Sequence, residues 1–250
     1  MRLWHRPQPA GFLVGWRGKL GFAERRVAKA APPGEFAALR EEMVEQQIRR
    51  RGIHSPRVLE AMRTVPRHEF VPVALRDEAY EDRPLPIGEG QTISQPYMVA
   101  SMAAALDLRG DERLLEVGAG CGYQAAILGS LAAEVFAVEV RSSLALAARE
   151  RLKRLGFSNV RVLCGDGTLG LAERAPFDAI LVTAAAPLVP DPLLEQLAEG
   201  GRLAIPVGSE ECQELRLIHK AGGQLTSRVV EECRFVPLVG KYGWPELSSR

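Results

Sequence analysis

Three glycines at alternate positions carry the clearest chemical signal in the chain. Gly118, Gly120 and Gly122 follow directly after an apolar run that ends at Val117, and an apolar stretch with helical character comes next. Glycine is needed where a chain leaves a strand, turns sharply and lets a ligand approach its backbone closely. This succession of strand, glycine loop and helix therefore predicts a pocket for a nucleotide-like ligand.

The spacing of the glycines argues against a pyrophosphate-containing ligand. The dinucleotide fingerprint G-x-G-x-x-G requires its last glycine where this chain has Tyr123. S-adenosylmethionine contains adenosine but no phosphate, so it suits this departure and is the cofactor that we expect. We assign Glu116, just before the glycines, to the same predicted cofactor site.

Acidic residues follow the next two predicted strands. Glu139 ends the second strand, about 20 residues after Gly118, where nucleotide-binding sheets read the ribose hydroxyls. Asp166 and Gly167 follow the third strand, where a carboxylate could accept a hydrogen bond from the adenine amino group. Taken singly, each feature is typical of a solvated charge or a turn. Their order along one sheet favours a cofactor site at the carboxyl ends of the strands.

The elements that must position these residues alternate in type from residue 113 onward. Such alternation predicts βαβ units with right-handed crossovers, and so an α/β fold with a doubly wound, mostly parallel, Rossmann-like sheet. The predicted strands are 112–117, 134–139, 159–164, 177–183 and 201–207. The predicted helices between them are 122–132, 142–155 and 191–199.

The two ends of this region follow different patterns. The segments 214–220 and 225–235 flank the glycine-containing tetrad 221–224, which predicts an antiparallel C-terminal hairpin. Near the start, an amphipathic stripe from Glu35 that ends at Gly52 predicts one N-terminal helix, and a second, short helix should hold Val58, Leu59 and Met62.

Composition excludes several classes of function. The 32 basic and 31 acidic residues nearly cancel, so we expect no binding to nucleic acid. The four cysteines form no C-x-x-C pair and the four histidines show no paired ligand spacing, so we expect reduced thiols and no metal site. Apolar runs stop well short of the ~18 residues of a membrane helix, and we therefore expect no membrane segment and a cytoplasmic location.

A further motif precedes the first strand of the sheet. The run Ile-Ser-Gln-Pro-Tyr-Met at 93–98 resembles the hallmark Ile-Ser-x-Pro-(His or Tyr)-Met of the protein-L-isoaspartate O-methyltransferase family. Other segments resemble the same family in order, over roughly residues 36 to 240: 57–62, 116–123, 165–167, 175–180, 200–203, 206–208 and 234–239. Of these, the 93–98 run is the specific one, because most methyltransferases of this fold share the glycine loop.

The resemblance implies roles for residues outside the cofactor loop. Ser94 would be the catalytic residue, with its hydroxyl near the carboxylate that accepts the methyl group. Tyr97, Thr183, Val236 and Val239 would contact the substrate, although one common form of the family has His at the position of Tyr97 and Gly at that of Thr183. The alternative is that Ser94 only caps a helix starting near Pro96, and that the two valines are core residues.

Together these features divide the chain into three regions. Residues 1–34 mix tryptophan, proline and basic residues without a sustained period, which predicts a loosely ordered, basic N-terminal extension. Residues 35–243 form the predicted S-adenosylmethionine-dependent methyltransferase domain, and 244–250 form a C-terminal tail. We expect a monomer.

The resemblance implies repair of damaged proteins and peptides by methylation of the free carboxylate of L-isoaspartyl residues. A carboxylate with a pKa near 4 is already ionised at neutral pH, so such a reaction needs no general base. Two alternatives remain open at the level of sequence: a methyltransferase of a small molecule or RNA, and a non-catalytic cofactor-binding protein. The chain lacks the Asn/Asp-Pro-Pro-aromatic run used in amino-group methylation, which argues against the first.

Overall fold

A computed structural model describes residues 33–209 and 211–245. The predictions for residues 1–32 and 246–250 lie outside the described residues. Within the described part of the chain, no helix is long and apolar enough to cross a membrane.

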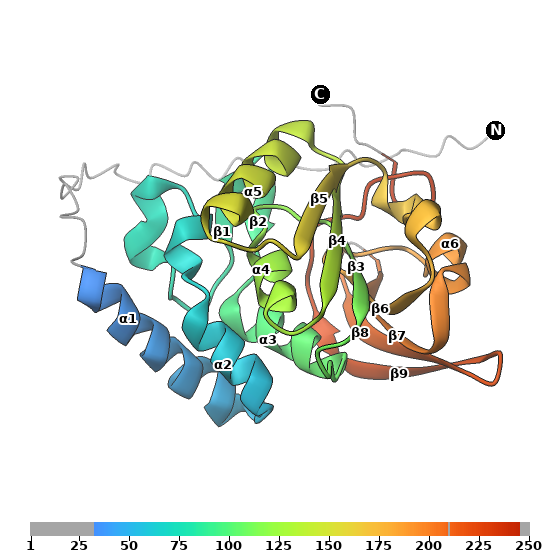
Figure 1. The fold of residues 1–250 in the computed structure, drawn as a ribbon, viewed down its shortest axis with the longest axis horizontal. Coiled ribbons are helices and arrows are strands. Elements are labelled where there is room, and N and C mark those ends of the chain that lie inside the picture. The colour runs from blue at the N-terminus through green and yellow to red at the C-terminus, as the bar shows by residue number, and fades with distance from the viewer. Residues whose placement is uncertain (1–32, 210, 246–250) are drawn as a thin grey trace, which may run out of the picture.

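A seven-stranded sheet with strand order β5-β4-β3-β6-β7-β8-β9 forms the centre of the molecule (Figure 1). The strands from β3 to β7 pair in parallel, and β7, β8 and β9 pair antiparallel. Their bounds are β3 Arg113–Val117, β4 Glu134–Glu139, β5 Val160–Cys164, β6 Phe177–Val182, β7 Leu197–Gly208, β8 Gln213–Ala221 and β9 Gln224–Cys233. The predicted mostly parallel sheet with an antiparallel hairpin at its edge is confirmed.

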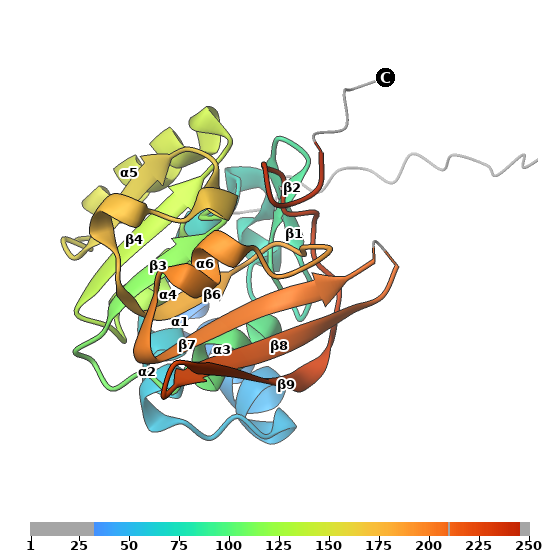
Figure 2. The same ribbon diagram turned by 90° about the vertical axis from the view of Figure 1, so that its right-hand side faces the viewer.

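Alternate residues of each strand face opposite sides of the sheet, because the side-chain period of a strand is two. Leu114 and Ala137 join the core under the helices α4 (Tyr123–Gly129) and α5 (Ser142–Arg154). Their neighbours Leu115 and Val138 join a second core under α6 (Asp191–Glu195), on the opposite face (Figure 2). The sheet is therefore covered on both faces, as a doubly wound fold requires.

The strand order reverses between β3 and β6. From β3 the chain proceeds outward to β4 and β5, and it then returns to place β6 on the other side of β3. In open α/β sheets, ligands bind at the carboxyl ends of the strands at such a reversal. The topology thus places the glycine loop after β3 at the expected binding position.

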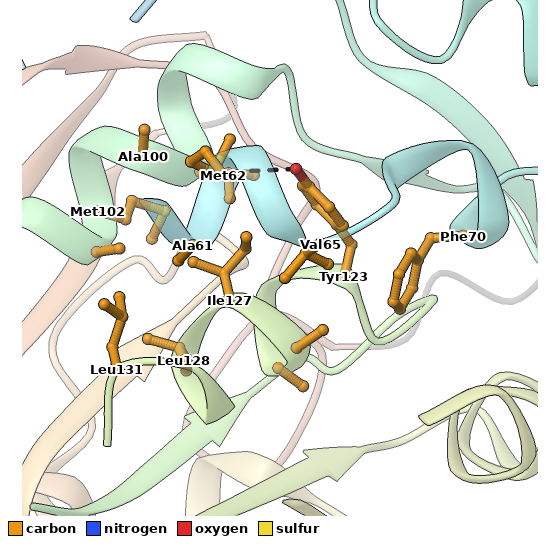
Figure 3. Close-up of a cluster of buried hydrophobic side chains, with 14 of the residues drawn as sticks. Ala61, Met62, Val65, Phe70, Ala100, Met102, Tyr123, Ile127, Leu128 and Leu131 are labelled. Atoms are coloured by element: carbon orange, nitrogen blue, oxygen red, sulfur yellow. Dashed lines mark hydrogen bonds between the residues drawn. The ribbon is translucent and has the colours of Figure 1, made fainter. Parts of the chain in front are cut away.

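The N-terminal helices pack on the same face as α4. The first begins as α1 (Pro33–Glu42) and continues through a π-helical segment, η1 (Met43–Ile48), and a 3₁₀ turn, η2 (Arg49–Arg51). Gly52 ends it with a φ of +97°, as predicted. The second predicted helix is α2 (Pro56–Thr64), and its Met62 packs beside Tyr123 of α4, whose ring also meets Phe70 edge-on at 5.3 Å (Figure 3).

The remaining elements connect these layers. A hairpin of β1 (Leu85–Gly88) and β2 (Gln91–Ile93), which was not predicted, leads into α3 (Pro96–Ala105). Four short 3₁₀ turns lie in the loops: η3 (Arg67–Phe70), η4 (Val73–Glu78), η5 (Gly167–Leu169) and η6 (Ala172–Arg174).

The predicted helix 191–199 was wrong at its C-terminal end. The helix α6 ends at Glu195, and β7 begins at Leu197, earlier than the predicted strand 201–207. Leu197 pairs with Phe177 of β6, and its side chain is buried in the core beneath α6. This long-range pairing, which no local pattern encodes, outweighs the helical character of the segment.

Removing the ring of Phe136 tests the core under α6. This side chain is 2% exposed, and its ring packs edge-on against that of Phe177 with centroids 6.1 Å apart. We expect Phe136→Ala to lower the free energy of unfolding by about 3–5 kcal/mol, measured by chemical denaturation. The control Leu146→Ala, at a side chain that is 55% exposed, should change it by less than about 0.5 kcal/mol.

Candidate cofactor and substrate site

A cavity lies at the carboxyl ends of the parallel strands, where open α/β sheets bind their ligands. Four segments supply most of its wall: the loop after β3, the end of β4, the start of η5 and the residues after β6. Val99 and the segments 91–94 and 236–239 complete the lining. The topology therefore brings together regions of the chain that are up to about 150 residues apart.

The glycine loop turns back onto β4 instead of continuing the strand. Gly118, Gly120 and Gly122 have φ values of +96°, +54° and +88°, which L side chains rarely adopt. The backbone N–H of Gly118 donates to the carbonyl of Val138 at 2.8 Å. A Cβ atom on Gly118 would lie 2.6 Å from the hydroxyl oxygen of Thr183, so both conformation and space demand glycine here.

Glu139 holds this loop in place. One carboxylate oxygen accepts the N–H of Gly120 at 2.7 Å, and the other accepts the N–H of Arg141 at 2.9 Å. The side chain is nearly buried and lines the cavity. A carboxylate offers about four acceptor positions, so two remain for hydroxyl donors of a ligand. The ribose-binding role of Glu139 stays a prediction.

Glu116 lies directly beneath the loop without a hydrogen-bond partner. It is fully buried, and neither carboxylate oxygen has a donor among the described residues. Burial, with a smaller contribution from the nearby Glu139, raises the pKa of Glu116 well above its ordinary value. It does not line the cavity, so any influence that it has on a ligand passes through the loop.

Asp166 is placed differently from what the sequence suggested. Its carboxylate accepts the N–H of Thr168 at 2.9 Å and the N–H of Lys241 at 2.8 Å, and it does not line the cavity. Its neighbour Gly167 does line the cavity, and a Cβ there would meet Val117 at 2.5 Å. Asp166 therefore caps η5 and binds the backbone of Lys241, and it is not among the residues that line the cavity.

Residues 238–244, which we name the C-terminal strap, close one side of the cavity. The N–H of Trp244 donates to the carbonyl of Leu238 at 2.7 Å, and its indole Nε1 donates to the carbonyl of Ala185 at 3.1 Å. Val239 lies in this strap and lines the cavity. Val236, just before the strap, also lines the cavity and packs partly against the core under α6.

The hydroxyl of Thr183 points at the glycine loop. Its oxygen lies 2.6 Å from the carbonyl of Gly118 and 3.1 Å from that of Val117, and its single proton is donated to one of them. Thr183 also contributes to the lining of the cavity. Thr183 thus links the loop after β3 to the end of β6.

A groove adjoins the cavity on the side of the β2–α3 segment. Four residues line both spaces, namely Thr92, Ser94, Thr183 and Val236. Ser94 is half-buried, and its hydroxyl has no hydrogen-bond partner among the described residues. The N-cap of α3 is Gln95, and no side chain caps the helix. The alternative interpretation of Ser94 as an N-cap is therefore wrong, because the helix begins one residue later than that role requires.

Tyr97 lies further along the groove, with partners that the sequence did not indicate. The guanidinium of Arg51 stacks over its ring, with Cζ 3.5 Å from the centroid. Burial and the nearby Glu231 raise the pKa of the Tyr97 phenol. Glu231 also accepts a short hydrogen bond from Ser101 of α3, so β9 and α3 are joined across the groove. Sequence analysis missed Arg51 and Glu231, because neither belongs to a motif.

The fold and this cavity define the class of protein: a Rossmann-like α/β protein with a cavity above the reversal of the sheet. The model of the family "Protein-L-isoaspartate(D-aspartate) O-methyltransferase (PCMT)" matches residues 38–243. Protein-L-isoaspartate O-methyltransferase 1 of Syntrophobacter fumaroxidans is 54% identical over 84% of this chain and 98% of its own length. That of Geobacter metallireducens is 57% identical over 84% of this chain and 97% of its own.

Two solved structures share the fold over most of the chain. A protein-L-isoaspartate O-methyltransferase superposes with a TM-score of 0.74 at 31% identity, over 82% of this chain and 67% of the other. A beta-aspartate methyltransferase (PCMT) from Plasmodium falciparum, in complex with S-adenosyl-L-homocysteine, superposes with a TM-score of 0.70 at 28% identity, over 80% of this chain and 98% of the other.

The chain belongs to the protein-L-isoaspartate(D-aspartate) O-methyltransferase family. It is an enzyme that uses S-adenosylmethionine as cofactor, and its function is the methylation of isoaspartyl residues in protein repair. The sequence-based assignments of family, fold class, reaction and cofactor are confirmed.

The residues present fit this cofactor. The three left-handed glycines leave the backbone open at the cavity, the Glu139 carboxylate keeps acceptor positions for the ribose, and no phosphate-binding group is needed. The orphaned carboxylate of Glu116 adds negative potential beneath the loop whenever it is ionised.

Replacing Glu116 by its neutral isostere tests the buried carboxylate. Because its pKa is raised in the fold, the unfolded chain ionises first, and the stability that Glu116 contributes is lost as the pH rises above 4.5 towards the folded pKa. We therefore expect the stability of Glu116→Gln relative to the natural chain to increase with pH above 4.5, measured by denaturation without cofactor. A stability difference between Glu116→Gln and the natural chain that stays constant as the pH rises above 4.5 would contradict this expectation.

Replacing Asp166 tests whether its carboxylate anchors the C-terminal strap or binds the cofactor directly. We expect Asp166→Ala to lower the free energy of unfolding by about 0.5–2 kcal/mol and to make the C-terminal strap more sensitive to limited proteolysis, because the cap of η5 and the bond to Lys241 are both lost. A large loss of affinity for S-adenosylhomocysteine with an unchanged proteolysis pattern would instead identify Asp166 as a direct cofactor ligand.

Proposed function

We propose that Ser94 orients the free carboxylate of an L-isoaspartyl residue for methyl transfer. The observation that supports this most directly is that the cofactor cavity and the groove share Ser94 in their common wall. A hydrogen-bond donor at the junction of the groove and the cavity can bind a substrate carboxylate that enters through the groove and reacts with the cofactor in the cavity. We further propose that Gly118, Gly120, Gly122 and Glu139 hold the cofactor.

The reaction requires little proton chemistry from the protein. S-adenosylmethionine, when bound, supplies an activated methyl group. The accepting carboxylate is already ionised at neutral pH, so no residue has to remove a proton. The work of the chain is to hold the carboxylate oxygen in line at about 3 Å and to exclude water. In this scheme Ser94 donates one hydrogen bond to the carboxylate, and the apolar side chains of Ile93 and Val236 in the lining restrict access of solvent.

We propose that the substrate enters as a flexible segment of damaged protein or peptide, along the groove between α3 and the end of β9. We assign Tyr97, Thr183 and Val236 in the groove, and Val239 in the adjoining cavity, to substrate contact. An isoaspartyl linkage displaces the free carboxylate relative to the backbone, so a groove that leads to a confined junction suits it better than a flat surface does. We propose that the enzyme acts as a monomer in the cytoplasm.

Methyl transfer to a synthetic peptide tests this proposal. With labelled cofactor, we expect the natural chain to methylate an isoaspartyl peptide and not its aspartyl isomer. Ser94→Ala should lower kcat/KM by about 10- to 100-fold, because a hydrogen bond to a charged group is lost.

The affinity for S-adenosylhomocysteine, measured by calorimetry, provides the control. It should change little in Ser94→Ala, because Ser94 is assigned to the substrate. Full activity of this variant would remove Ser94 from the reaction, and equal methylation of the two isomers would refute the isoaspartyl specificity.

A further inference from the structure

The open part of the groove carries an arginine that is held in a fixed position. Arg51 ends the helical segment that begins with α1, and its guanidinium lies flat on the ring of Tyr97 at 3.5 Å from Cζ to the centroid. Stacking of this kind restrains a side chain that otherwise has high rotamer entropy. The guanidinium is therefore organised before any substrate arrives.

A second contact ties Arg51 to the segment that carries Ser94. Its Nη1 donates to Asp82 at 3.0 Å, and the other oxygen of Asp82 accepts Nε2 of Gln95 at 3.2 Å. Gln95 directly follows Ser94 in the chain. The position of the Arg51 guanidinium relative to the Ser94 hydroxyl is thus set by one bridging carboxylate and one aromatic ring.

Most donors of Arg51 remain free. A guanidinium has five N–H groups, and among the described residues Asp82 is its one hydrogen-bond partner. The side chain is 43% exposed and lines the groove together with Ser94 and Tyr97. Donors that are fixed, unsatisfied and open to the groove are suited to an acceptor oxygen on a chain lying there.

The charges near Arg51 nearly balance, so we do not expect the groove to select strongly for acidic groups. A carbonyl oxygen is the acceptor that these charges favour. Asp82 offsets the charge of Arg51, and the groove also contains Glu231, Glu232 and Arg234. Glu231 is already engaged by Ser101, and opposite charges at the mouth leave little net field. Arg51 therefore contributes directional hydrogen-bond donors to the groove rather than a strong electrostatic attraction.

We propose that Arg51 is a specificity-determining residue that binds an acceptor oxygen of the substrate chain beside the isoaspartyl residue. This inference rests on the proposed function of the groove. The acceptor can come from the peptide backbone or from an acidic side chain, and both present oxygen lone pairs to the same N–H groups.

The test compares Arg51→Ala with Arg50→Ala, which removes the same charge from the same turn at an exposed residue that lines neither space. Two isoaspartyl peptides serve as substrates, one with neutral and one with acidic flanking residues. We expect Arg51→Ala to raise KM by about 5- to 20-fold with kcat changed less than about twofold, and Arg50→Ala to leave both nearly unchanged. Arg51→Lys, which keeps the charge but not the planar fork, should restore only part of the affinity.

The pattern of losses identifies the acceptor. An equal rise of KM for both peptides supports a backbone carbonyl, and a larger rise for the acidic peptide supports a carboxylate. A KM for Arg51→Ala within twofold of that for Arg50→Ala would overturn the inference, as would a fall in kcat accompanied by weaker binding of S-adenosylhomocysteine. Failure of the natural chain to methylate either peptide would instead overturn the proposed function.

Discussion

The way in which strand β3 ends is the constraint on which the rest of the site depends. Three residues in left-handed conformations turn the chain away from the sheet, and the N–H groups of this turn bind the end of β4 through Val138 and Glu139. Without that turn, β3 would continue across the reversal of the strand order and fill the space above it. Because Thr183 fastens the same loop to the end of β6, three strands share one rigid edge.

Around that edge, two segments from other parts of the chain complete the walls of the cavity. The segment before α3 brings Ser94 to the front of the cavity, and the C-terminal strap closes the side, anchored by Asp166 and by the carbonyl of Ala185. The hydrogen bond between Ser101 and Glu231 joins the groove walls. The groove is thus formed by long-range contacts, whereas the wall of the cavity is formed largely by consecutive strand ends.

Much of the fold could be predicted because it depends on local periodicity. The β-branched runs, the glycine loop and the hairpin tetrad 221–224 each indicate one element, and right-handed crossovers leave few ways to assemble them. The β1–β2 hairpin escaped prediction because its strands are short and lack alternation. The end of α6 was misplaced because the pairing of Leu197 with Phe177, which lies 20 positions earlier, decides it.

By itself the sequence determined the family, the class of fold, the cofactor and the candidate positions Ser94, Gly118 and Glu139, since motif spacing and backbone conformation are local properties. Only the tertiary structure decided what the polar side chains contact. The Asp166 carboxylate binds the strap, the Thr183 hydroxyl binds the glycine loop, and Glu116 is buried without a donor among the described residues. The tertiary structure also placed Arg51 on Tyr97, because hydrogen-bond partners and burial depend on residues that folding brings together from distant parts of the chain.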